Sequence, residues 1–215
     1  MAQETEFLKF IKLLDNNGCL SHVILVGSWA EFLYDKANLL PKFVSNLRTL
    51  DVDFMVKNIH KPKEKIDIVK LARDDGFLVE KDRLFGTTKI INPEGLEIEF
   101  IIAKRGAGSE ASVKTNLGVT AQSLRHLDIL SKYTKIVEFF NMDIEVPLPE
   151  AFVIHKIIIN NERKDKKEKD KISINSIYQH IDKTKFNEIY ETLTLKEQKI
   201  VTEYVEKNVE IVMLV

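Results

Sequence analysis

The sequence predicts an α/β (α+β) fold, in which a small mixed sheet is followed by a helical C-terminal part. The first part of the chain contains apolar runs of strand length, separated by turns that contain Gly, Pro or Asn. The last part has apolar residues at helical spacing. Between the two, Pro147-Leu148-Pro149 interrupts the pattern. We therefore predict two domains, a core over residues 1–147 and a helical domain over residues 148–215.

The composition is that of an ordinary soluble globular protein, since 44% of the 215 residues are hydrophobic and 30% are charged. The formal net charge is −1, so nothing global indicates a nucleic-acid partner. A single cysteine, Cys19, excludes a disulfide framework and favours a reducing compartment. The N-terminus has no leader-like pattern, and no apolar run is long enough to span a membrane. We expect a cytoplasmic protein without a membrane partner.

The N-terminal elements follow from hydrophobic spacing. Residues 4–17 are predicted as a helix, because apolar side chains recur at helical spacing up to Asn16-Asn17-Gly18. Residues 23–26 form an apolar run long enough for a buried strand, and a helix is predicted after Gly27-Ser28. A second apolar run, residues 50–56, is predicted as the next strand.

The middle of the chain alternates between helix and strand. Residues 61–75 have the pattern of an amphipathic helix, and residues 77–79 that of a short strand. Residues 84–92 and 96–103 flank a Pro/Gly turn, which predicts a hairpin. The loop over residues 104–112 is a plain connector or closes over a substrate. It is not a Walker loop, because no Gly-Lys-Ser/Thr follows.

From Thr120 onward the pattern is mostly helical, with a short helix that contains Leu124, Leu127 and Leu130. One more hairpin is predicted over residues 135–146. Beyond the domain boundary the spacing predicts four helices, over residues 150–161, 172–182, 184–193 and 195–210.

Asp51 and Asp53 are the first candidate site residues. In a strand they point to the same face, roughly 6–7 Å apart, and repel each other unless a cation lies between them. Two divalent metal ions can share such carboxylates and hold a phosphoryl group, and magnesium suits this because it leaves positions for phosphate and water. The intervening residues point the other way and are expected in the core: Leu50, Val52, Phe54 and Val56.

Gly27 and Ser28 supply the complementary feature. Glycine lets the backbone approach a phosphate closely, and Ser28 lies where a helix starts, so free N–H groups and the helix dipole favour an anion there. Either feature alone fits an ordinary turn or two solvated aspartates. Both together, in this order, predict a nucleotide site.

These residues carry a resemblance. Val26-Gly27-Ser28, then Leu50-Asp51-Val52-Asp53-Phe54, resembles the signature of the DNA polymerase beta-type nucleotidyltransferase superfamily. The spacing between the two parts is longer than in the compact signature, and an insertion around residues 39–46 would account for it. The resemblance implies a third acid on a neighbouring strand. We assign it to Glu99 in preference to Glu97, which is nearer the turn, so Asp51, Asp53 and Glu99 are the predicted metal ligands and catalytic residues.

The second half of the site is predicted from a weaker likeness. The order of Lys156, Arg163 and Lys169-Asp170 resembles the C-terminal helices of bacterial abortive-infection and toxin-like nucleotidyltransferases, and Arg48-Thr49 resembles that group's approach to its Asp-x-Asp strand. The resemblance implies that these basic residues bind the nucleotide together with Gly27 and Ser28. The alternative is a solvated helix face, with Lys156 extending to solvent.

The resemblance implies transfer of a nucleoside monophosphate from a nucleoside triphosphate (NTP) to an acceptor hydroxyl, on RNA, protein or a small molecule, with two Mg²⁺ ions. Two alternatives stay open. One is a non-catalytic nucleotide-binding module of a toxin–antitoxin-like pair, with a cognate antitoxin-like protein as partner. The other is an antibiotic nucleotidyltransferase. The five histidines show no ligand spacing, so a zinc site is not expected.

Overall fold

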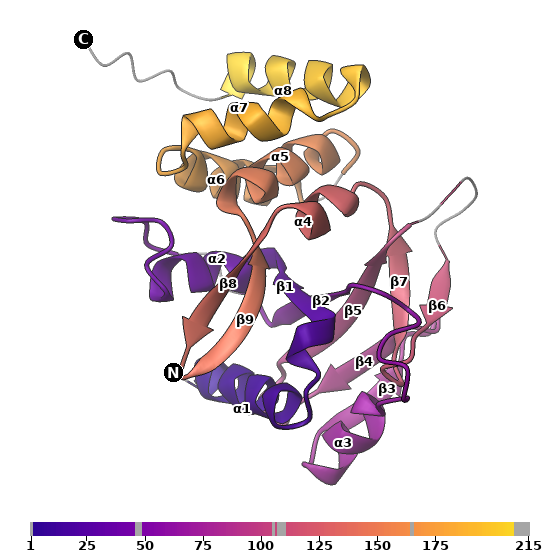
Figure 1. Cartoon of the computed structure of the whole chain (residues 1–215). Coiled ribbons are helices and arrows are strands. Elements are labelled where there is room, and N and C mark those ends of the chain that lie inside the picture. Colours follow the sequence, from indigo (N-terminus) through magenta and orange to yellow (C-terminus); the bar gives the residue numbers. More distant parts are fainter. Residues whose placement is uncertain (1, 46–48, 105, 107–110, 164–165, 209–215) are drawn as a thin grey trace.

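A mixed sheet lies at the centre of the computed structural model (Figure 1), which describes residues 2–45, 49–104, 106, 111–163 and 166–208. Within these residues, seven strands form the sheet: β1 (Val23–Val26), β2 (Asp51–Val56), β3 (Leu78–Lys81), β4 (Thr88–Ile91), β5 (Glu97–Ala103), β6 (Ser112–Lys114) and β7 (Thr120–Leu124). The main path is β1-β2-β5-β4-β3, and β7 pairs with β5 and β6. β5 is parallel to β2 and β7, whereas the other pairs are antiparallel.

The helices divide into two groups. The first surrounds the sheet and comprises α1 (Ala2–Asn16), the 3₁₀ turn η1 (Leu20–His22), α2 (Gly27–Lys36), α3 (Ile68–Asp74) and α4 (Asp128–Lys132). A separate hairpin, β8 (Thr134–Phe139) and β9 (Met142–Pro147), leads to the second group, α5 (Pro149–Asn160), α6 (Lys167–Tyr178), α7 (Lys183–Glu191) and α8 (Leu195–Asn208). Figure 1 shows the second group stacked at the top of the view, beyond α4. The predicted fold class, a mixed sheet with a helical C-terminal part, is confirmed.

One face of the sheet packs in the hydrophobic core, and the other carries the aspartates of β2. Val52, Phe54 and Val56 are fully buried, and the Phe54 ring lies 5.8 Å from that of Phe10 on α1. Leu50 is 46% exposed, so its predicted place in the core is wrong, because it precedes the first paired residue of β2. The alternation of strand side chains turns the aspartates of β2 to the other face. That face carries the candidate site.

Three predicted helices differ from the observed elements, and one of them, predicted over residues 172–182, is observed as α6 over Lys167–Tyr178. The helix predicted over residues 61–75 begins only at Ile68, where the Asp67 side chain accepts a hydrogen bond from the backbone N–H of Lys70. Residues 120–124 form β7 instead of a helix. Its alternately buried side chains pair the strand with β5, and this long-range pairing overrides the helical spacing of the leucines that follow.

The predicted boundary after residue 147 falls between β9 and α5. Side chains from both parts, such as Phe32 and Ile174, belong to one buried hydrophobic cluster. The Tyr34 hydroxyl on α2 donates a hydrogen bond of 2.8 Å to the Pro147 carbonyl oxygen. The shared cluster packs the helical part against the core, and the Tyr34 bond holds the end of β9, from which α5 follows. None of the helices in the described part of the chain is long and apolar enough to cross a membrane.

Candidate functional site

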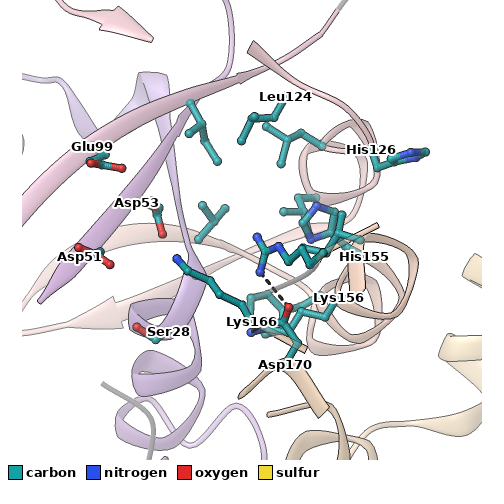
Figure 2. Close-up of a pocket in the computed structure, with 18 of the residues that line it drawn as sticks. Ser28, Asp51, Asp53, Glu99, Leu124, His126, His155, Lys156, Lys166 and Asp170 are labelled. Carbon is teal, nitrogen blue, oxygen red and sulfur yellow. Dashed lines mark hydrogen bonds and ion pairs between the residues drawn. The ribbon is translucent and has the colours of Figure 1, made fainter. Parts of the chain in front are cut away.

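A cavity of about 340 Å³ lies between the carboxylate face of the sheet, the β7–α4 segment, α5 and the start of α6. Figure 2 shows side chains from these elements pointing into it. Eight of the nine predicted site residues line this cavity: Gly27, Ser28, Asp51, Asp53, Glu99, Lys156, Arg163 and Lys169. The ninth, Arg48, lies outside the described residues. The structure thus brings together residues that are far apart in the sequence.

Strand pairing aligns the acidic residues. β2 and β5 run parallel, and their register sets Asp53 beside Glu99 and Asp51 beside Glu97. Asp51, Asp53 and Glu99 line the cavity, whereas Glu97 is not among its lining residues. This placement favours Glu99 as the third acid, although its role stays a prediction.

The pKa of Asp53 is raised by its surroundings. Burial, followed by the charges of Glu99 and Asp51, raises its pKa from the ordinary value of 3.8 to about 6, and the positive charges of Lys166 and Arg163 act in the opposite direction. The site therefore has a surplus of negative charge close to Asp53. A bound cation would relieve it.

Gly27 is required by the position of Asp53. Its φ angle of +71° is in the left-handed region, and a Cβ atom at this position would lie 2.6 Å from Asp53 Oδ2. The residue begins α2, and Val26 before it has no side-chain group that could cap the first N–H groups of the helix. A carboxylate of the kind that can hold a cation therefore lies directly beside a helix start that favours an anion.

Thr49 holds the two signature segments together. Its Oγ1 atom lies 2.9 Å from Ser28 Oγ and donates a hydrogen bond to the Asp51 carbonyl oxygen, while its own carbonyl oxygen accepts one from Trp29 Nε1. Trp29 is fully buried and stacked on Phe7. These bonds join the start of α2 to the start of β2.

Lys89 on β4 is a residue of the site that the sequence did not predict. Its Nζ atom lies 3.0 Å from Glu99 Oε1 and 2.5 Å from Glu97 Oε2, and these bonds raise the pKa of the lysine. The contact depends on the hairpin register, in which Lys89 is the cross-strand neighbour of Glu99. The lysine thereby fixes the orientation of the Glu99 carboxylate.

The helical part contributes a buried ion network. Lys156 Nζ lies 3.3 Å from Glu31 Oε1 and 3.2 Å from Asp170 Oδ1, and Arg163 Nη1 donates to Asp170 Oδ2 at 2.9 Å. Glu31 also accepts a 2.7 Å hydrogen bond from the Ser173 hydroxyl. Neither Glu31 nor Asp170 was predicted as a partner of Lys156. They join α2 of the core to α5 and α6, and contact of Lys156 with a nucleotide stays a prediction.

Two more basic residues lie at the start of α6. Lys169 is half-buried in the cavity wall. Lys166, which was not predicted, precedes the helix, and Figure 2 shows its side chain extending toward Asp51 and Asp53. Arg163 lies beyond the end of α5, yet it lines the cavity together with Lys156.

The acids fit magnesium by their donor chemistry. In the part of the chain that the structure describes, no three His, Cys, Asp or Glu side chains are grouped closely enough to hold an ion by themselves. Magnesium commonly takes one or two carboxylates and completes its coordination with water and substrate phosphate. The raised pKa of Asp53 is the kind of perturbation that such a cation would reverse. Magnesium binding itself stays a prediction.

A family model described as Nucleotidyltransferase matches residues 5–195. The chain belongs to this nucleotidyltransferase family. The family match supports the predicted superfamily and a general nucleotidyltransfer function with a nucleotide substrate. Compared by sequence with curated proteins, the chain shows no significant match.

Solved structures show the same fold. One is the crystal structure of an antigenic nucleotidyltransferase-like protein from Paracoccidioides brasiliensis, with a TM-score of 0.55 and 15% identity over 95% of this chain and 88% of that chain. Another is ANT(2″)-Ia in complex with adenylyl-2″-tobramycin, with a TM-score of 0.54 and 11% identity over 95% of this chain and 99% of that chain. The nucleotidyltransferase thus shares its overall architecture with proteins of very different sequence.

The ion network yields a stability prediction. Replacing Lys156 with methionine leaves Glu31 without its cation, and we expect the free energy of unfolding to fall by about 3 kcal/mol, the lower end for breaking a buried ion pair, because Arg163 still compensates Asp170. Urea unfolding would measure this. The matched control is Lys199→Met, which removes an exposed pair with Glu203 and should change little. Equal unfolding midpoints for both variants would contradict the prediction.

Proposed function

We propose that this nucleotidyltransferase transfers a nucleoside monophosphate from an NTP to an acceptor hydroxyl in a magnesium-dependent reaction. The acceptor oxygen would bond to the α-phosphorus, the bond from that phosphorus to the bridging oxygen would break, and pyrophosphate would leave. The observation that carries the proposal is the position of Asp53, which lies beside Glu99 and against the helix start at Gly27. Such a site suits a cation and a phosphate at the same time.

Each of the core residues would have a separate role in this reaction. Asp51 and Asp53 would hold the magnesium ions, which would offset charge on the attacking and leaving oxygens. Glu99 would complete the metal site and accept the proton of the acceptor hydroxyl, with Lys89 fixing its carboxylate. The helix start at Gly27 and Ser28 would bind the terminal phosphates.

The helical part would offset the remaining phosphate charge. Lys166 and Lys169 line the cavity at the start of α6, and Arg163 lies beside them. Basic side chains at these positions would bind phosphate oxygens that the metal ions leave uncovered. Lys156 would join them if a triphosphate displaces its ammonium from Asp170.

The acceptor is part of the proposal and has three candidate classes: an RNA end, a protein hydroxyl and a small molecule. The solved structure of ANT(2″)-Ia is a complex with adenylyl-2″-tobramycin. This supports a small molecule as one of the candidate acceptors. An RNA or protein acceptor would match the resemblance to toxin-like proteins. In that case we also propose an antitoxin-like protein as a partner of this chain.

An assay with α-phosphate-labelled NTPs tests the proposal. The purified protein is incubated with magnesium and, separately, with total RNA, total protein and a small-molecule extract. Label should appear in one fraction and disappear for Asp51→Asn. Tight nucleotide binding without transfer in any fraction would favour the non-catalytic module instead.

The same assay tests the third acid. Glu99→Gln should lower the transfer rate by about a hundredfold, the lower range for loss of a general base, because Glu99 lines the cavity beside Asp53. Glu97→Gln is the matched control, since it lies two residues away on the same strand and also bonds to Lys89. We expect it to retain most activity. An inactive Glu97 variant beside an active Glu99 variant would show that the assignment is wrong.

A further inference from the structure

Thr49 lines the cavity where the start of α2 meets the start of β2, and its hydroxyl group is bonded on two sides. Its Oγ1 atom donates a hydrogen bond of 3.1 Å to the Asp51 carbonyl oxygen, which can only accept. A hydroxyl group has one proton, so the 2.9 Å bond between Thr49 and Ser28 is donated by the Ser28 hydroxyl. Thr49 therefore engages the Ser28 hydroxyl as an acceptor.

The hydrophobic core holds Thr49 in place. Its carbonyl oxygen accepts a 3.1 Å hydrogen bond from Trp29 Nε1. The Trp29 side chain is fully buried and stacked on Phe7, with 4.2 Å between the ring centroids. Because a close-packed side chain of this kind cannot move without disturbing its neighbours, Thr49 is a fixed partner for Ser28.

The start of α2 needs such a partner for its serine. Ser28 is the second residue of the helix, and the N-cap residue, Val26, forms no side-chain hydrogen bond to it. The first N–H groups of a helix have no acceptor within the helix, and a serine side chain can turn back to backbone groups close to it. If Ser28 did so, its oxygen would occupy the N–H groups that a phosphate would use.

We propose that Thr49 is a positioning residue, which holds the Ser28 hydroxyl away from the start of α2 and so keeps the helix N–H groups available to the terminal phosphates. The inference rests on the proposed function, in which this helix start binds the triphosphate. The phosphate would then supply the cap that Val26 does not provide.

Calorimetry with inorganic tripolyphosphate and magnesium tests the inference, because this ligand has phosphates but no sugar or base. Thr49→Val keeps the shape of the side chain and removes its hydroxyl group. We expect this variant to bind tripolyphosphate about tenfold more weakly, since the released Ser28 oxygen competes for an N–H group that would otherwise bond to a charged phosphate. Thr49→Ser keeps a hydroxyl group and should bind like the unmodified protein.

The double variant Ser28→Ala with Thr49→Val separates positioning from a general loss of structure. Alanine has no oxygen that could turn back to the helix start. The double variant should therefore bind tripolyphosphate more tightly than Thr49→Val alone, and about as tightly as Ser28→Ala. If Thr49 only supported the fold, the added Ser28→Ala would be neutral or harmful. Thr49→Ala replaces Thr49→Val in this comparison if the valine variant does not fold.

Thr115→Val is the matched control, because the Thr115 hydroxyl also donates to a backbone carbonyl oxygen, that of Val119, at 2.9 Å, and Thr115 is not among the residues that line the cavity. It should bind tripolyphosphate like the unmodified protein.

The inference is wrong if Thr49→Val binds as tightly as the unmodified protein, or if Ser28→Ala restores no affinity to it. Absence of tripolyphosphate binding to the unmodified protein would also overturn it. The expected binding pattern without transfer to any acceptor would contradict the proposed function alone.

Discussion

Replacing Asp53 with asparagine should abolish nucleotidyl transfer while stabilising the metal-free protein at neutral pH. The loss of activity should reach about a thousandfold or more, because a metal-holding carboxylate contributes several kcal/mol to stabilising the transition state. The raised pKa shows that the folded protein destabilises the charged form of this carboxyl group. Asparagine has no charged form, so the substitution should raise the stability. A single substitution thus changes activity and stability in opposite directions.

The pH dependence fixes the sign of the stability effect. In the unfolded chain the Asp53 carboxyl group loses its proton near pH 4, whereas in the folded protein it does so near pH 6. Between these values the folded state holds the proton more strongly, so the free energy of unfolding falls as the pH rises. The penalty is complete above pH 6, and Asp53→Asn should remove it, a gain on the order of 1–3 kcal/mol.

Thermal melts at pH 4 and pH 8 in the presence of a chelator would measure this. Asp53→Asn should melt higher than the unmodified protein at pH 8, with a smaller difference at pH 4. The exposed Asp143 on β9 provides the control, since Asp143→Asn should change neither stability nor activity. A lower melting temperature of Asp53→Asn at pH 8 would contradict the account of the carboxylate cluster.

Gly27→Ala is expected to have the second large effect. The new Cβ atom would lie 2.6 Å from Asp53 Oδ2, so the carboxylate must move. The Asp53 side chain can rotate, so the fold should survive, but a displacement of about 1 Å in a catalytic group can cost a hundredfold in rate. We expect a loss of activity of at least about that size.

Gly18→Ala separates the backbone strain that Gly27→Ala causes from the contact of its Cβ atom with Asp53. Gly18 has a similar φ angle, +66°, but no atom lies within 4 Å of its added Cβ, so this variant shares only the backbone strain. It should lose stability without losing activity. In the Asp53→Asn background, Gly27→Ala should have little further effect on rate, because both changes act through the same carboxylate. Full additivity in the transfer assay would contradict the proposed contact.

Local sequence patterns predicted the acidic half of the site. Apolar runs fixed the strands around Asp51 and Asp53, and alternation within residues 96–103 brought Glu99 to the same face as Glu97. The preference for Glu99 over Glu97 stays a prediction, and the cavity that supports it depends on α5 and on the β7–α4 segment. Strand β7 was missed because its few alternating residues precede leucines at helical spacing.

The remaining site residues depend on contacts between distant segments. Lys89 meets Glu99 through the exact strand register of a hairpin, and Lys156 meets Glu31 only after α5 has packed against α2. Spacing within one segment carries no information about such partners. His155 is buried, and that its Nε2 atom has no hydrogen-bond partner among the described residues is visible only in the folded structure.

We propose that the acids of β2 and β5 and the start of α2 form one metal-dependent nucleotide site. Calorimetric titration of an NTP into the unmodified protein, with millimolar magnesium and with a chelator, measures this dependence. We expect binding that is at least about tenfold tighter with magnesium, and loss of this difference in Asp51→Asn. Equal affinity of the unmodified protein for the NTP with and without magnesium would contradict it.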